Sequence, residues 1–141
     1  MKRLYHLFLV AAIAASLASC SKGGNYTSPC ADLEVRGVIT NADGAGLGSM
    51  NVCIAHTVKG SDEYTYTSED VITTSADGSF LKTYSEFHPK YTNLKLMVSD
   101  PSGKYRDKTV FYTNLVYYDA DGLYEGFCQI DFSTVALYPK K

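Results

Sequence analysis

The side chains that could carry covalent or acid–base chemistry are few in this chain of 141 residues, and they lie far apart. Beyond the first twenty residues there are two histidines, His56 and His88, about thirty residues from each other. Neither has an acidic partner at a matching spacing, and no GxSxG turn is present. Active sites and metal sites need several convergent groups. The sequence therefore predicts no catalytic residue, no metal site, no cofactor and no enzymatic activity.

One cysteine, Cys20, stands in a pattern that specifies its chemistry. A basic start is followed by an apolar stretch that ends in Leu17-Ala18-Ser19-Cys20. These residues match the bacterial lipobox, in which the cysteine sulfur receives a diacylglyceryl group before cleavage. The apolar stretch has about 14 residues, fewer than the roughly 20 of a membrane-spanning helix. We therefore expect residues 1–19 to be a signal peptide and Cys20 to be lipidated; the alternative is an ordinary signal peptide with a chance cysteine.

The residues after Cys20 indicate how the chain is attached and where. Residues 20–31 begin with a Gly- and Ser-containing stretch, a composition typical of a flexible tether. Several acyl chains together hold a protein stably on a membrane. Ser21 lacks the acidic character associated with retention at the inner membrane. We therefore expect a lipid anchor in the outer membrane, and both the periplasm-facing and the surface-facing orientation remain open.

Charge excludes some partners of the exported part. Without Lys2 and Arg3, 11 basic residues face 15 acidic ones, which gives a formal charge of −4. The charges are scattered and form no basic stripe. This balance disfavours nucleic acid and anionic lipid headgroups as partners.

The other cysteines leave their pairing open. A thioether at Cys20 removes it from the set and leaves Cys30, Cys53 and Cys128, which allow one bridge at most. Their spacings of 23 and 75 residues do not match the close pairs of a zinc site. Export permits a disulfide. One bridge in any of the three pairings and three unpaired thiols both remain open.

Residues 32–141 alternate apolar and polar side chains repeatedly, with turn residues about every ten positions, which is typical of half-buried strands. Leu33, Val35 and Ile39 share one face of the first run, and Met50, Val52 and Ile54 share one face of the second. We expect these two runs to form a hairpin or a corner. Later strands are expected around Tyr64–Tyr66, Val71–Thr74, Phe80–Leu81, Leu94–Val98 and Thr109–Tyr112, and Cys128–Phe132 together with Val135–Leu137 is expected to form one closing strand.

Turn residues refine this prediction. Asp77-Gly78 lies between Val71–Thr74 and Phe80–Leu81, so these two runs are expected to form a hairpin with Asp-Gly at its tip. A change of parity near Ser133-Thr134 predicts a β-bulge. Residues 114–126 are the least regular and are expected to form a loop. The pattern predicts an all-β fold, a single domain of about seven strands in a β-sandwich.

Two further patterns bear on ligand binding. Tyr64 and Tyr66 alternate on what we expect to be an edge strand, where exposed rings could form a binding surface, although an ordinary strand face explains them as well. Asp119-x-Asp121-Gly122 resembles the start of a calcium loop, but Leu123 and Ile130 occupy positions that need oxygen ligands. A surface turn therefore explains these residues better than a metal ion.

The strand motifs resemble those of a known domain family. The residues concerned are Val35-x-Gly37-x-Ile39-Thr40, Asp43-Gly44-x-x-Leu47, Val52-x-Ile54 and Thr74-x-x-Asp77-Gly78-x-Phe80. They resemble the carboxypeptidase regulatory-like domain, and this resemblance implies a seven-stranded transthyretin-like, or Ig-like, sandwich. Gly46 and Ser49 depart from the family, which usually has Pro and Gly at these positions.

A narrower resemblance covers nearly the whole exported chain. Residues 26–32, the strand motifs above and residues 119–127 resemble the radical SAM-associated lipoproteins of Bacteroidetes-type bacteria. The resemblance implies a radical SAM enzyme encoded nearby, which either binds this chain or modifies it, and it identifies no particular residue as modified. We therefore expect a non-enzymatic interaction or scaffold domain on the membrane whose partner is a radical SAM enzyme or another envelope protein. The alternative is a surface module that binds glycans or proteins through Tyr64 and Tyr66.

Overall fold

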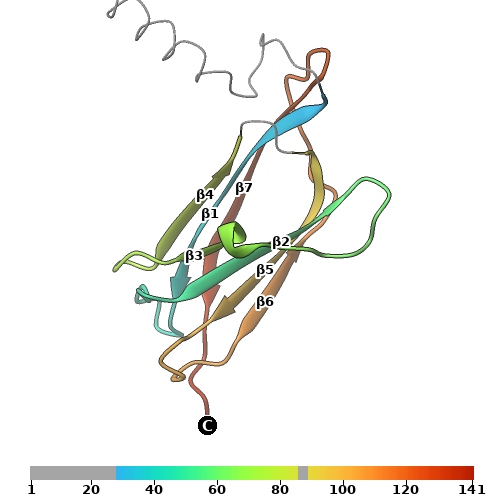
Figure 1. The fold of residues 1–141 in the computed structure, drawn as a ribbon. Helices are drawn as coiled ribbons and strands as arrows, with labels where there is room; N and C mark the ends of the chain where they lie inside the picture. Colours follow the sequence, from blue (N-terminus) through green and yellow to red (C-terminus); the bar gives the residue numbers. More distant parts are fainter. Residues whose placement is uncertain (1–27, 86–88) are drawn as a thin grey trace, which may run out of the picture.

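A computed structural model describes residues 28–85 and 89–141 (Figure 1). The described residues form two β-sheets and one short 3₁₀ turn, η1 (Ser68–Asp70). The expected all-β class is therefore confirmed. No helix in this part of the chain has the length and apolar character needed to cross a membrane. Cys20, residues 1–27 of the expected signal peptide and tether, and His88 lie outside the described residues.

The first sheet has three strands in the order β4-β1-β7. These strands are β1 (Cys30–Thr40), β4 (Ser79–Tyr84) and β7 (Tyr124–Ala136). β1 lies in the centre, antiparallel to β4 and parallel to β7. It begins two residues before the expected domain boundary, because Cys30 and Ala31 are already buried.

The second sheet has four strands in the order β3-β2-β5-β6, all paired antiparallel. Its strands are β2 (Asn51–Val58), β3 (Val71–Thr73), β5 (Tyr91–Ser99) and β6 (Lys108–Tyr112). β1 and β2 therefore belong to different sheets and form a corner, which settles the choice left open by the sequence.

The expected hairpin between Val71–Thr74 and Phe80–Leu81 is wrong. β3 pairs with β2, and β4 pairs with β1 in the other sheet. Asp77-Gly78 does form a tight turn, in which Gly78 N–H donates to Ser75 O at 2.8 Å and Ser75 N–H donates to Ser79 O at 2.9 Å. The pairing stops there because the chain crosses from one sheet to the other. The turn residues specify a local reversal and not the partners of the strands on either side.

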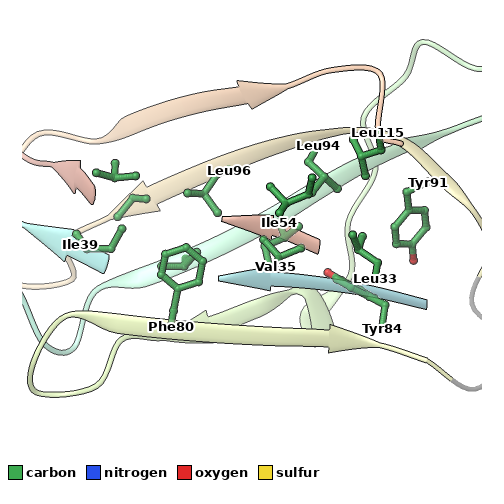
Figure 2. Close-up of a cluster of buried hydrophobic side chains, with 14 of the residues drawn as sticks. Leu33, Val35, Ile39, Ile54, Phe80, Tyr84, Tyr91, Leu94, Leu96 and Leu115 are labelled. Atoms are coloured by element: carbon green, nitrogen blue, oxygen red, sulfur yellow. The ribbon is translucent and has the colours of Figure 1, made fainter. Parts of the chain in front are cut away.

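The apolar faces of the two sheets form one core, with side chains from both layers meeting between them (Figure 2). Val35 and Phe80 come from the three-stranded sheet, whereas Ile54 and Leu96 come from the four-stranded one. Burying each side chain of this size stabilises the fold by about 1.5–3 kcal/mol. The alternation predicted for β1 and β2 is confirmed, since Leu33, Val35, Ile39, Met50, Val52 and Ile54 are all buried.

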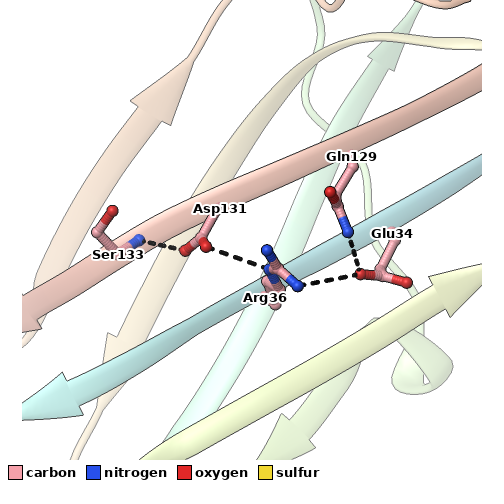
Figure 3. Close-up of polar contacts among 5 residues, drawn as sticks. All are labelled: Glu34, Arg36, Gln129, Asp131 and Ser133. Carbon is pink, nitrogen blue, oxygen red and sulfur yellow. Dashed lines mark hydrogen bonds and ion pairs between the residues drawn. The ribbon is translucent and has the colours of Figure 1, made fainter.

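β7 contains the predicted bulge. Its register with β1 shifts between the pairs Arg36↔Asp131 and Val38↔Thr134, and Ser133 has a φ of 54°. The Asp131 carboxylate accepts the Ser133 N–H at 2.7 Å and so stabilises the irregular backbone (Figure 3). The bulge lets β7 continue along β1 to the end of the strand.

Candidate functional site

A buried polar cluster lies at the edge of the domain next to η1. His56 is on β2 and pairs with Leu94, which places its side chain on the core face of the four-stranded sheet. Its Nε2 lies 3.6 Å from Asp70 Oδ2, and its ring stacks on Tyr91 with 3.7 Å between ring centroids. Tyr84, from the other sheet, donates its hydroxyl to Asp70 Oδ1 at 2.7 Å. The fold thus brings an imidazole, a carboxylate and two phenols together.

η1 positions Asp70 through a capping box. The Asp70 carboxylate accepts the Thr67 N–H at 2.7 Å, and the Thr67 hydroxyl accepts the Glu69 N–H at 3.3 Å. These reciprocal bonds satisfy donors that a helix start leaves open. The pattern Thr67-x-x-Asp70 is visible in the sequence and could have identified the turn. The approach of Asp70 to His56 and Tyr84 depends on tertiary contacts.

Asp70 and the two tyrosines of the cluster have defined protonation states near neutral pH. Burial opposes the charge of Asp70, but hydrogen bonds from Tyr84 and Thr67 and the nearness of His56 outweigh it and lower its pKa. Burial and then the Asp70 charge raise the pKa of Tyr91 to about 12, and burial and the bond to Asp70 keep the pKa of Tyr84 far above its ordinary value. Asp70 is therefore an acceptor and Tyr84 a donor, which fixes the direction of their hydrogen bond.

The cysteines do not add a nucleophile to this cluster. Cys53 and Cys128 are free thiols, and burial raises the pKa of both, so they stay protonated near neutral pH. Cys30 is disulfide-bonded. No bridge therefore joins any two of these three cysteines. In residues 28–85 and 89–141, no group of three or more His, Cys, Asp and Glu side chains is placed to hold a metal ion.

Tyr64 lies on the opposite, outward face of the four-stranded sheet. Its ring meets the edge of Phe111 with 5.9 Å between centroids, and the Lys95 ammonium lies 5.0 Å from the Tyr64 ring centroid. Lys95 and Phe111 are paired neighbours on β5 and β6. We call Tyr64, Lys95 and Phe111 the Tyr64 patch. Phe111 is 59% exposed, so the patch presents an aromatic surface beside a cation.

The segment around Tyr64 and Tyr66 is not the expected edge strand. Its backbone pairs with the sheet at one residue, where Thr65 exchanges two backbone hydrogen bonds of 3.0 Å with His56. β3 forms the edge instead. Tyr66 is exposed, whereas Tyr64 is half-buried against the sheet. The sequence therefore identified an aromatic surface residue, while its neighbours Lys95 and Phe111 come from strands about thirty and fifty residues later.

The outward face of the three-stranded sheet has a different character (Figure 3). Arg36 lies between two carboxylates, with its Nε 3.1 Å from Asp131 and an Nη 3.9 Å from Glu34. Gln129 donates to Glu34 at 2.6 Å. These charged and polar side chains of the three-stranded sheet therefore bind one another.

The segment Asp119-x-Asp121-Gly122 forms a turn. Tyr124 N–H donates to Asp121 O at 3.0 Å, and Asp121 N–H donates to Tyr124 O at 2.8 Å. Asp119 and Gly122 both have φ near 60°. The turn predicted for these residues is confirmed.

Comparison with known proteins shows similarity at the level of the fold. No family model and no curated protein matches the chain. Catechol 1,2-dioxygenase from Acinetobacter radioresistens is similar, with a TM-score of 0.52 and 16% identity over 78% of this chain and 52% of the dioxygenase. A point mutant of that enzyme, with glycine in place of an alanine, gives a TM-score of 0.52 and 15% identity over 97% of this chain and 69% of that one. The chain thus spans about half the length of the wild-type dioxygenase.

This likeness overturns one expectation. The prediction of no enzymatic activity is wrong. It excluded catalysis from the spacing of residues along the sequence, whereas the chain shares its fold with catalytic proteins. The spacing misled because a two-sheet fold can join distant residues, as it joins His56 to Asp70 and Tyr84. At this identity the likeness shows the fold alone, and the reaction of the dioxygenases remains theirs.

Proposed function

We propose that this chain is an envelope lipoprotein whose domain, a seven-stranded transthyretin-like sandwich, binds a partner protein through the Tyr64 patch. The observation that carries the proposal is the arrangement of Tyr64, Phe111 and Lys95 on the outward face of the four-stranded sheet. Aromatic rings supply large contact areas at low entropic cost, and they are enriched where proteins bind one another. The cation beside them adds selectivity for an acidic or carbonyl-rich surface.

The anchor is the part of the proposal that rests on Cys20. A lipidated Cys20 uses its sulfur in a thioether, so the proposal requires that the disulfide of Cys30, which joins neither Cys53 nor Cys128, does not involve Cys20. Intact mass and peptide mapping of the native protein decide both points. A diacylglyceryl-modified Cys20 at the mature N-terminus in the outer-membrane fraction is expected, together with loss of membrane attachment in Cys20→Ser. A disulfide between Cys20 and Cys30 would contradict lipidation.

The partner we propose is a radical SAM enzyme or a protein of the same system. Support comes from the resemblance of residues 26–32 and 119–127 to lipoproteins encoded beside such enzymes. Genes on either side of this one are expected to include a radical SAM enzyme. Mass spectrometry of the native protein from cells with and without that enzyme tests for a substrate, since a substrate that gains or loses atoms changes in mass beyond the lipid only when the enzyme is present.

The binding surface is tested with matched variants. Phe111→Ala and Tyr64→Ala are expected to abolish co-purification with the proteins of the neighbouring genes, because each removes a ring of the patch. Leu81→Ala is the control, since Leu81 is 60% exposed and lies on β4 in the other sheet. Equal loss in Leu81→Ala, or full binding by Phe111→Ala, would contradict a role for the patch.

Glycan binding is the second candidate, and the exposure of Tyr66 and Phe111 favours it, because flat rings can stack on sugars. A glycan array probed with the full mature protein tests it. Binding that disappears in Tyr66→Ala and survives in Leu81→Ala supports a glycan module. An array without signal contradicts it.

A further inference from the structure

The end of the domain where the described chain begins also carries a loop with exposed apolar side chains. Cys30 N–H donates to Leu123 O at 3.0 Å, and Cys30 pairs with Tyr124 across β1 and β7. The loop of residues 113–123 therefore lies beside the start of β1, at the top of the molecule in Figure 1.

Apolar side chains on this loop point away from the core. Val116 is 57% exposed, Tyr118 is 67% exposed and Leu123 is 41% exposed. We call these three residues the loop rim. Three large apolar side chains of one short loop are thus exposed at the end of the domain where the described chain begins.

The loop rim is held in place by its backbone. Tyr118 and Phe127 exchange two hydrogen bonds of 2.9 Å each. Gly126 makes this close approach possible, since a Cβ there would lie 2.5 Å from Tyr118 O. Tyr117 also anchors the loop by donating its hydroxyl to Tyr91 O at 3.0 Å. The side chains of the rim are therefore presented by an ordered loop.

Charges of both signs surround the loop rim. A hollow of about 690 Å³ next to it is lined in part by Lys59, Lys90, Val116 and Glu125. Asp119 and Asp121 lie in the loop itself. This mixture does not complement an anionic surface. It does complement headgroups that carry both a phosphate and an ammonium group, because lysines can pair with the first and carboxylates with the second.

The length of the tether decides which end of the domain meets the bilayer. Seven residues lie between Cys20 and Ser28, where the described structure begins, which makes eight residue steps, and an extended chain spans at most about 3.6 Å per step. A lipid on Cys20 therefore holds this end within about 30 Å of the bilayer. β1 has 11 residues and carries the chain about 35 Å away from it, at roughly 3.3 Å per residue.

We propose that the loop rim docks on the zwitterionic headgroup layer of the bilayer that holds the anchor. Tyrosine is enriched at this depth of a membrane, where its ring is in an apolar region and its hydroxyl in water. Docking provides a second attachment in addition to the lipid anchor. It also orients the four-stranded sheet, with its Tyr64 patch, along the membrane normal. The inference rests on lipidation of Cys20 as proposed above.

The absence of tryptophan from the sequence permits a direct test. The lipidated protein is reconstituted in vesicles of phosphatidylcholine and phosphatidylethanolamine, with or without brominated chains. Tyr118→Trp places a fluorescent reporter in the loop rim, and Val116→Trp provides a second one. Tyr138→Trp is the matched control, because Tyr138 is 56% exposed and lies just beyond the opposite end of β7.

Bromine is expected to quench the rim reporters at least about twofold more than the Tyr138→Trp reporter, since only the rim enters the interface. Circular dichroism of each variant confirms that it is folded. Equal quenching in a protein whose mass shows the lipid would overturn docking and leave the anchor intact. A mass without lipid would overturn the anchor and, with it, the docking that depends on it.

Discussion

Tyr84 and Asp70 join the two sheets through a hydrogen bond of 2.7 Å from the Tyr84 hydroxyl to Asp70 Oδ1. Tyr84 ends β4 of the three-stranded sheet, and Asp70 ends the 3₁₀ turn that leads into β3 of the four-stranded sheet. Both side chains are buried. A buried carboxylate is stable only when its oxygens have donors, so this bond helps to fix how the sheets meet at this edge.

Removing the hydroxyl should therefore destabilise the fold. Tyr84→Phe keeps the ring and leaves Asp70 Oδ1 without this donor, which we expect to cost about 1–3 kcal/mol of unfolding free energy. Urea unfolding followed by circular dichroism measures it. Tyr138→Phe is the control, because Tyr138 is exposed. An unchanged midpoint in Tyr84→Phe would show that Asp70 finds another donor.

Asp70 should also contribute to the acid sensitivity of the protein. Burial opposes its charge, but its hydrogen bonds from Tyr84 and Thr67 and the nearby His56 lower its pKa below the ordinary 3.8. The folded state thus binds the proton less tightly than the unfolded chain. The stabilisation from the charged Asp70 is complete above pH 3.8, the pKa of the unfolded chain, and is lost as the pH falls through the lower pKa of the folded state.

Stability against urea should therefore decline more steeply below about pH 4 in the wild type than in Asp70→Asn, which has no carboxylate to protonate there. The measurement is a series of urea midpoints between neutral pH and about pH 2. Asp62→Asn, which alters an exposed carboxylate, serves as the control and should follow the wild-type curve. If the stability of Asp70→Asn declined with falling pH as steeply as that of the wild type, a contribution of Asp70 to acid sensitivity would be ruled out.

Gly46 should tolerate no side chain. A Cβ at this position would lie 1.9 Å from Asp77 O, a backbone atom that cannot move away easily. We expect Gly46→Ala to cost about 2–3 kcal/mol. Gly60→Ala is the comparison, since Gly60 has a φ of 85° and nothing within 4 Å of the added Cβ, so only backbone strain of about 1 kcal/mol applies. Equal melting temperatures for the two variants would contradict the close contact.

Asp100 should order the turn after β5. Its carboxylate accepts the N–H groups of Ser102 at 2.8 Å, Lys104 at 2.8 Å and Tyr105 at 3.0 Å. In Asp100→Ala these donors lose their acceptor, so their amide protons should exchange faster with solvent. Hydrogen exchange measured by NMR tests this, with Asp107→Ala as the control. Unchanged protection of all three amides would show that the turn is held by other contacts.

Local patterns predicted the strands well, because the alternation of faces along a strand depends only on successive residues. Leu33, Val35 and Ile39 are buried and Arg36 is exposed, as their parity required. The bulge at Ser133 was predicted for the same reason, since a change of parity within one run has a local cause. The glycine at position 46 also has a reason in the structure, since the backbone of Asp77 lies against it and leaves no room for a Cβ.

The pairing of strands could not be predicted from local patterns, because hydrogen bonds between strands join residues that are distant in the sequence. The Asp77-Gly78 turn indicated a hairpin, yet β3 and β4 lie in different sheets. The polar cluster was missed for the same reason, since His56, Asp70 and Tyr84 lie 14 residues apart in succession and only tertiary contacts bring their side chains together.

The sequence by itself determined the strand faces and the turns, and it is also the basis of the predicted lipobox around Cys20, because each of these depends on a few consecutive residues. Only the tertiary structure decided that Tyr64 lies against Phe111 and Lys95, and that the loop of residues 113–123 lies beside the start of β1. These contacts arise when two sheets bury one core, and the geometry of that packing places side chains from distant strands on a common surface.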